Sequence, residues 1–234
     1  MLVYVLSEGD HLEGRTPPRG HTAASPHDTQ VITVPAGDEN TMTWLADEVK
    51  ARVDRFRDET GRRDTMIWAL RIASHGNAGF MAIGAGLDPH SAIAFSSLSG
   101  YFSSQGPGIE LWGCAAASAS PIDPGYGTDD VYTEQEFEAY LRWNDAGAIA
   151  TRVPGHRRGT DYPALLRGTR TYRERVVSGR GYRLLQELAR AAQVNATAAF
   201  DTQFPEFNGD NWQWEGTGLL TVFPDGGHRI TELS

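Results

Sequence analysis

Short apolar runs of strand length recur along this sequence and alternate with segments of helical periodicity. The apolar runs cover residues 2–6, 31–34, 66–73, 108–113, 194–200 and 219–223. Amphipathic helices are predicted over residues 41–57 and 181–192, and shorter helices over residues 92–102 and 134–143. Strands that alternate with helices favour a largely parallel sheet covered on both faces. The sequence therefore predicts an α/β fold.

The length of the chain favours a single domain. It has 234 residues, of which 40% are hydrophobic, and such a chain can bury a real core. We expect one domain over residues 1–234, with a long insertion or loop at about residues 117–180. The apolar stretch at residues 1–7 is too short for a signal peptide or a membrane span. We therefore expect a cytoplasmic protein without a membrane partner.

The charge of the chain is acidic overall but unevenly spread. The formal net charge of −9 argues against broad nucleic-acid binding. Residues 151–190, however, contain ten arginines. An alternative function is therefore the binding of an acidic ligand or nucleic acid through Arg152, Arg157 and Arg158. The segment has few aromatic residues for stacking on bases, so we expect no nucleic-acid partner.

Cys114 is the single cysteine of the sequence, and it follows a buried strand. His75 follows another such strand, within Ser74-His75-Gly76. Ligands gather at the carboxyl ends of parallel strands, where these two side chains can be neighbours. A cysteine nucleophile needs a base or an imidazolium nearby, because the thiolate is the attacking species. The pattern favours a Cys-His catalytic pair.

The glycines beside these residues fit the same chemistry. Gly76 and Gly113 let a substrate backbone approach closely, and the amides of Gly76 and Cys114 can form an oxyanion hole. The structural alternative is a buried, inert cysteine, because free cysteine is among the most buried residue types. The combination of Ser-His-Gly with Gly-Cys favours the catalytic interpretation.

Two sequence blocks carry a family resemblance. They are LRIASHGNAGFMAIG at residues 70–84 and IELWGCAAA at residues 109–117. Both resemble the His-Gly and Gly-Cys blocks of the caspase-like cysteine peptidases of clan CD. The resemblance is closest to the caspase-related domain of large bacterial surface proteins, whose Trp-rich closing segment is similar to residues 208–226. It implies a three-layer α/β/α sandwich with a mostly parallel central sheet, with His75 as general acid/base and Cys114 as nucleophile.

The sequence also departs from that family. The Gln-Ala-Cys-x-Gly signature of eukaryotic caspases is absent, so specificity for aspartate does not follow. The segment between Cys114 and the helix at residue 181 is longer than expected, which fits a regulatory or processing loop. Self-cleavage after an arginine of residues 151–180 is one hypothesis. The other is that these arginines form a solvated helix face.

Three acidic residues are candidates for a substrate pocket. In a caspase-like fold the primary pocket lies at the ends of the first strand and of the strand after the nucleophile, where this chain has Glu8, Asp10 and Asp201. A carboxylate in such a pocket favours arginine or lysine in the substrate. Solvent-exposed acids at strand ends are the alternative.

No metal or cofactor is expected. The seven histidines lack the spacing of zinc ligands, and the glycine pairs lack a dinucleotide-binding fingerprint. Asp123, Asp129 and Asp130 are more typical of an acidic surface loop than of a calcium site. The expected partners are a peptide or protein substrate and, as a further candidate, an activating protein. A catalytically inactive caspase-like binding or signalling module is the alternative to an endopeptidase.

Overall fold

The computed structural model describes residues 1–8, 28–35, 37, 39–113, 116–117, 177, 179–200, 207–208, 211–212, 214 and 218–232. The main sheet has seven strands in the order β11-β10-β7-β6-β3-β1-β2. Their bounds are β1 Leu2–Ser7, β2 Thr29–Val34, β3 Ala69–Ala73, β6 Gly108–Trp112, β7 Ala196–Ala199, β10 Gly218–Val222 and β11 His228–Glu232. Strands β2, β1, β3, β6 and β7 are parallel, whereas β10 and β11 are antiparallel to their neighbours. The predicted α/β fold with a mostly parallel sheet is thus confirmed.

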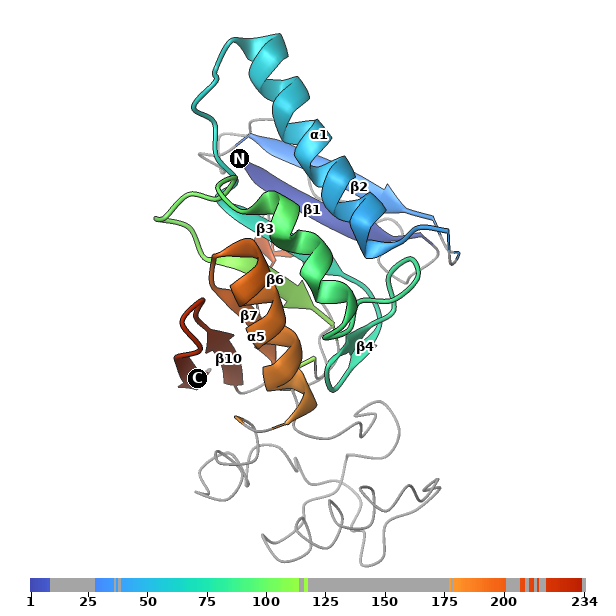
Figure 1. Ribbon diagram of the computed structural model, residues 1–234, viewed down its shortest axis with the longest axis vertical. Helices are drawn as coiled ribbons and strands as arrows, with labels where there is room; N and C mark the ends of the chain where they lie inside the picture. The colour runs from blue at the N-terminus through green and yellow to red at the C-terminus, as the bar shows by residue number, and fades with distance from the viewer. Residues whose placement is uncertain are drawn as a thin grey trace, which may run out of the picture.

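Three helices cover one face of this sheet (Figure 1). They are α1 (Met42–Thr60), the 3₁₀ helix η1 (Ser91–Leu98) and α5 (Arg180–Ala192). Their buried residues share a core with alternate residues of the strands, such as Val3, Leu70 and Leu111. The described residues include no helix on the second face, so the third layer of the sandwich stays a prediction.

Helix α1 follows the predicted apolar pattern. The Thr41 hydroxyl accepts a hydrogen bond from the amide of Trp44 at 3.2 Å and caps the helix. The buried residues face the sheet at helical spacing, and they are Met42, Leu45, Ala46, Val49 and Val53. The helix ends at Gly61, whose φ of 71° is left-handed.

The segment predicted as a short helix over residues 92–102 is the 3₁₀ helix η1. Its buried residues Ala92, Phe95 and Leu98 are three residues apart. A 3₁₀ helix has three residues per turn, so it aligns these side chains on one line, whereas an α-helix would rotate them apart. The repeat of three therefore explains the type of helix.

Several other predicted boundaries are corrected. The strand over residues 66–73 begins only at Ala69, and it is followed by a hairpin of β4 (Gly76–Asn77) and β5 (Phe80–Met81). The strand over residues 219–223 is β10, and the strand that follows it, β11, was not predicted from the sequence. That strand is a polar edge strand; among its side chains that the structure describes, Ile230 packs against the core, so the strand lacks an apolar signal. The helix predicted over residues 134–143 lies outside the described residues.

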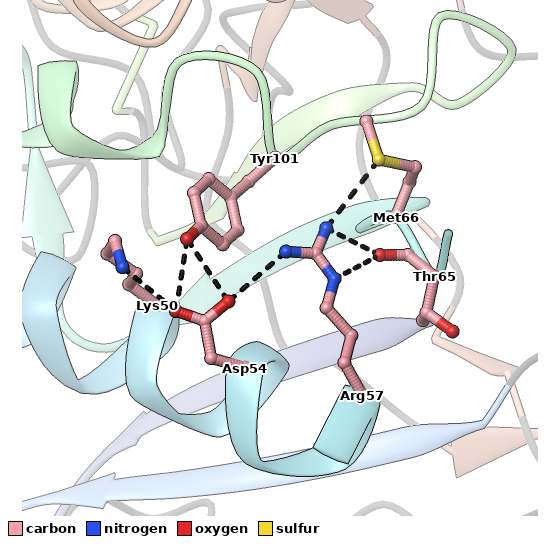
Figure 2. A network of polar contacts seen from close by, with 6 residues as sticks. All are labelled: Lys50, Asp54, Arg57, Thr65, Met66 and Tyr101. Atoms are coloured by element: carbon pink, nitrogen blue, oxygen red, sulfur yellow. Dashed lines mark hydrogen bonds and ion pairs between the residues drawn. The ribbon is translucent and has the colours of Figure 1, made fainter. Parts of the chain in front are cut away.

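A polar network holds the second half of α1 against the loops beside it (Figure 2). The Asp54 carboxylate accepts hydrogen bonds from Lys50 at 2.8 Å, Arg57 at 3.1 Å and the Tyr101 hydroxyl at 3.0 Å. Arg57 also donates two hydrogen bonds to the carbonyl of Thr65. Tyr101 and Thr65 flank the bridge between Ile67 and Phe102, before β3 and β6 begin. The network therefore lies at the amino ends of these strands.

A small hairpin of β8 (Phe207–Asn208) and β9 (Asn211–Trp212) precedes β10. Within the part of the chain that the structure describes, no helix is long and apolar enough to cross a membrane.

Candidate functional site

The carboxyl ends of β3 and β6 lie side by side in the sheet (Figure 1). These strands pair in parallel, and their last pair is Ala73 with Trp112. His75 follows Ala73 by two residues, and Cys114 follows Trp112 by two residues. The structure thus places His75 beyond the carboxyl end of a buried strand, as predicted. Cys114 lies outside the described residues.

The residue before Cys114 is in close contact with the residue before His75. A Cβ atom built on Gly113 would lie 3.1 Å from the carbonyl oxygen of Ser74 and would collide with the Met81 sulfur. Such contacts are closer than ordinary side chains allow. The two strand ends therefore stay adjacent beyond their last strand pair, and a side chain at position 113 would require the Met81 side chain to move.

The β4–β5 hairpin follows His75 and is hydrogen-bonded to the residues after Cys114. The amide of Gly79 in this hairpin donates a hydrogen bond to the carbonyl of Ala116 at 3.1 Å. The amide of Ala117 in turn donates to the carbonyl of Ala199, at the end of β7, at 3.0 Å. We call residues 113–117 the cysteine segment. Its described residues on both sides of Cys114 are therefore fixed to the sheet and to the hairpin that follows His75.

The amino end of α5 meets the cysteine segment. A Cβ atom on Gly181 would lie 2.6 Å from the carbonyl oxygen of Ala116 and equally close to the Cα atom of Ala117. Gly79 contacts the same helix end, because its Cβ would lie 2.6 Å from the carbonyl oxygen of Arg180. Ala117 and the amino end of α5 therefore lie together, beside the hairpin that follows His75.

His75 has a fixed backbone and is exposed to solvent. Its carbonyl accepts hydrogen bonds from the Ala82 amide at 2.7 Å and from the Ser74 hydroxyl at 2.9 Å. Ser74 is buried, so this hydroxyl ties the backbone to the interior. A histidine held at its backbone and open at its surface is accessible to a substrate.

The other predicted site residues are partly placed. Gly76 begins β4, opposite Met81, and is half-buried. Glu8 is exposed directly after β1, the strand beside β3. Strand order reverses between β1 and β3, and ligands of open α/β sheets bind at such a point. Asp10 and Asp201 lie outside the described residues, as do Asp123, Asp129 and Asp130.

A buried ion pair beneath this region was missed by the sequence interpretation. Arg71 on β3 donates a hydrogen bond to Glu110 on β6 at 2.7 Å, and another to the hydroxyl of Tyr4 on β1 at 2.7 Å. The sequence shows each charge alone, as an interruption of an apolar run four residues before His75 or Cys114, and the two become partners only when β3 and β6 are known to be neighbours. Opposite charges at matching positions of two parallel strands predict a cross-strand pair.

Burial and the contacts within this group shift the pKa values of Arg71 and Tyr4. Burial alone would lower the pKa of the Arg71 guanidinium, but the adjacent Glu110 carboxylate and Tyr4 hydroxyl raise this pKa above its ordinary value. Burial also raises the pKa of Tyr4, although Arg71 opposes that change. Arg71 is therefore a permanent cation in the interior of the protein.

The described residues contain no cluster of three or more histidine, cysteine or acidic side chains that would hold a metal ion. Comparison with protein-family models, with curated proteins and with solved structures finds no significant match to this chain. The fold defines an α/β protein with a mostly parallel seven-stranded sheet. Its candidate site is the carboxyl edge of β3 and β6.

Proposed function

We propose that this chain is a cysteine endopeptidase, with Cys114 as nucleophile and His75 as general acid/base. The observation that carries the proposal is the contact between the two strand ends, where Gly113 lies against the carbonyl of Ser74. The residues that follow each of them in the chain are Cys114 and His75. The order of strand, His-Gly hairpin, strand and Gly-Cys is also the order that the caspase-like resemblance implies.

The chemistry follows from these roles. The imidazole of His75 takes the thiol proton, and the Cys114 thiolate attacks the carbonyl carbon of the scissile peptide bond. The imidazolium then gives its proton to the leaving amine and the carbon–nitrogen bond breaks. The acyl group stays on the Cys114 sulfur as a thioester. Water, activated by His75, then releases the acid and the free thiol. The amides of Gly76 and Cys114 are our candidates for stabilising the oxyanion.

The proposed substrate is a peptide with a basic residue before the scissile bond. Glu8 supports this specificity, since it is exposed after β1 at the point where the strand order reverses. Asp10 and Asp201 belong to the same proposal. Glu8→Gln should then raise KM for an arginine peptide and leave KM for a neutral peptide unchanged.

The test uses Cys114→Ala and His75→Ala with fluorogenic peptides. Each substitution should reduce turnover by several orders of magnitude while thermal unfolding stays cooperative. His90→Ala is the matched control, because His90 is another exposed histidine, at the start of η1. Since the chain has one cysteine, iodoacetamide labelling followed by mass spectrometry reports on Cys114 alone. Hydrolysis that persists in Cys114→Ala would disprove the proposal.

The same variants test self-processing. Wild-type protein and Cys114→Ala are incubated side by side, and their intact masses are compared. Cuts within residues 151–180 in the wild type alone support self-cleavage, whereas an uncut chain or equal cutting in both excludes it. A wild type that binds peptides without hydrolysing them would favour the alternative, a caspase-like binding module.

A further inference from the structure

A row of polar side chains crosses the second face of the sheet at one register. It consists of Tyr4, Arg71, Glu110, Thr197 and Thr221, each paired with the next on neighbouring strands. Side chains alternate between the faces of a strand, so the row shares its face with Trp112. Charged groups in such a place are costly unless they are paired.

Arg71 is the centre of this row. Its guanidinium is bound by the Glu110 carboxylate on one side and the Tyr4 hydroxyl on the other. The side chains of Arg71 and Glu110 are only 15% and 9% exposed. The third neighbour is the ring of Trp112, whose centroid lies 5.8 Å from the guanidinium carbon. A desolvated cation at this distance from an indole is attracted to it.

Trp112 links the ion pair to the candidate site. It is the last residue of β6 and is joined directly to Gly113, the first residue of the cysteine segment. It is buried, and its ring stacks on that of Trp214, with centroids 3.8 Å apart and planes 11° apart. The ion pair and the stack therefore hold three parts of the chain together: β3, β6 and the segment before β10.

We infer that Arg71 and Glu110 are positioning residues for the carboxyl end of β6 and for Gly113, which precedes Cys114, acting through Trp112 and its stack on Trp214. A buried ion pair adds little stability compared with apolar residues of similar volume. Its contribution lies in geometry, because the planar fork of arginine fixes the directions of its hydrogen bonds. The inference rests on the proposed function for its readouts in turnover and in alkylation, because both presuppose the Cys114–His75 pair, whereas the signal of the tryptophan stack does not depend on that function.

The test compares two double variants. Arg71→Met/Glu110→Met removes both charges, so it leaves no unpaired ion and is expected to fold. Thr197→Val/Thr221→Val is the matched control, since these hydroxyls lie 3.0 Å apart in the same buried row and belong to strands β7 and β10. The measurements are the near-ultraviolet circular dichroism of the tryptophan stack, the rate of Cys114 alkylation, and kcat and KM. Trp214→Phe identifies the signal of the stack.

We expect the Arg71/Glu110 double variant to lose the stack signal. Its alkylation rate at pH 7 should fall about tenfold, because a thiol without its histidine partner is mostly protonated there. At pH 10 its rate should equal that of the wild type, because both thiols are then ionised. Turnover should show kcat lower by about tenfold with KM unchanged. The threonine double variant should match the wild type in all these measurements.

The outcomes separate the inference from the proposed function. A double variant with the wild-type stack signal, or with wild-type alkylation at pH 7, overturns the inference even if the enzyme is active. A wild type without hydrolysis overturns the proposed function, while the stack signal still decides whether the Arg71–Glu110 pair holds the Trp112–Trp214 stack at the end of β6. If the apolar variant does not fold, Arg71→Lys is used, which keeps the charge but not the fork. An Arg71→Lys variant with the stack signal and the alkylation rate of the wild type would also refute the inference.

Discussion

Gly79 and Gly61 offer a test of how tightly the candidate site is packed. Both glycines have the same left-handed backbone, with φ of 72° and 71°. A Cβ atom on Gly61 would meet nothing within 4 Å, whereas one on Gly79 would lie 2.6 Å from the carbonyl oxygen of Arg180. Alanine at either position therefore has the same backbone cost, and only Gly79→Ala adds a collision.

The magnitudes follow from these contacts. Left-handed backbone costs an L-residue about 1–2 kcal/mol, which is the whole effect expected for Gly61→Ala. The colliding atoms at Gly79 are Arg180 backbone and Cβ atoms, which cannot rotate away. Overpacking of this kind costs about 1–3 kcal/mol more. Gly79→Ala should therefore destabilise the protein by about 2–5 kcal/mol.

Urea unfolding followed by tryptophan fluorescence measures both variants. Gly79→Ala should also slow Cys114 alkylation at pH 7, because the Gly79 amide is hydrogen-bonded to the carbonyl of Ala116. Gly61→Ala should leave the alkylation rate unchanged. Equal destabilisation of the two variants, within about 0.5 kcal/mol, would refute the packing described for the hairpin, the cysteine segment and α5.

Three further predictions concern packing and charge. Gly113→Ala should lower the free energy of unfolding by about 1–3 kcal/mol. The double variant Gly113→Ala/Met81→Ala should lose less than the sum of the two single variants, because the Met81 sulfur is the nearest obstacle to a side chain at position 113. A double-mutant cycle in urea measures the difference. Asp54→Asn should lower the free energy of unfolding by about 1 kcal/mol at pH 7, because the Asp54 carboxylate binds Lys50 and is 39% exposed. The hydrogen bond from Lys50 lowers the pKa of Asp54 in the folded protein. The stability that the carboxylate contributes is therefore complete above the unfolded pKa of about 4 and is lost as pH falls through the folded pKa. Thermal unfolding between pH 3 and 7 measures this loss, and Asp58→Asn, at an exposed position of the same helix, is the control. The same pH dependence of stability in both variants would contradict the prediction. Leu188→Ala should cost about 2–5 kcal/mol, because Leu188 is fully buried on α5, and a smaller loss in urea unfolding would show that this helix is not packed as described.

Much of the helical face could be predicted from the sequence. The spacing of Leu45, Val49 and Val53 predicted α1, and the apolar runs predicted the central strands. Apolar periodicity reports the one buried face of α1, whereas continuous apolar runs report strands that are buried on both faces, such as β1 and β6. The prediction that His75 follows a strand depends on the same signal, which explains why it is confirmed.

The features that the sequence did not reveal depend on pairing between distant strands. Strand β11 is polar and exposed, so only its register with β10 identifies it. Arg71 and Glu110 look unfavourable in separate apolar runs, and they make sense only when β3 and β6 are neighbours. The contact between Gly113 and Ser74 likewise depends on backbone positions rather than on residue type. Local patterns do not contain such information.

The contact between Ala117 and Gly181 has a consequence for how the chain can vary. The ends of the segment between them are already together, so the sheet requires no particular span from that segment. Closing a flexible loop becomes harder only slowly with length, by about 0.6 kcal/mol for each doubling. Residues added between Ala117 and Gly181 should therefore cost the described part of the fold little stability. This makes the position a natural place for joining a second protein to the chain.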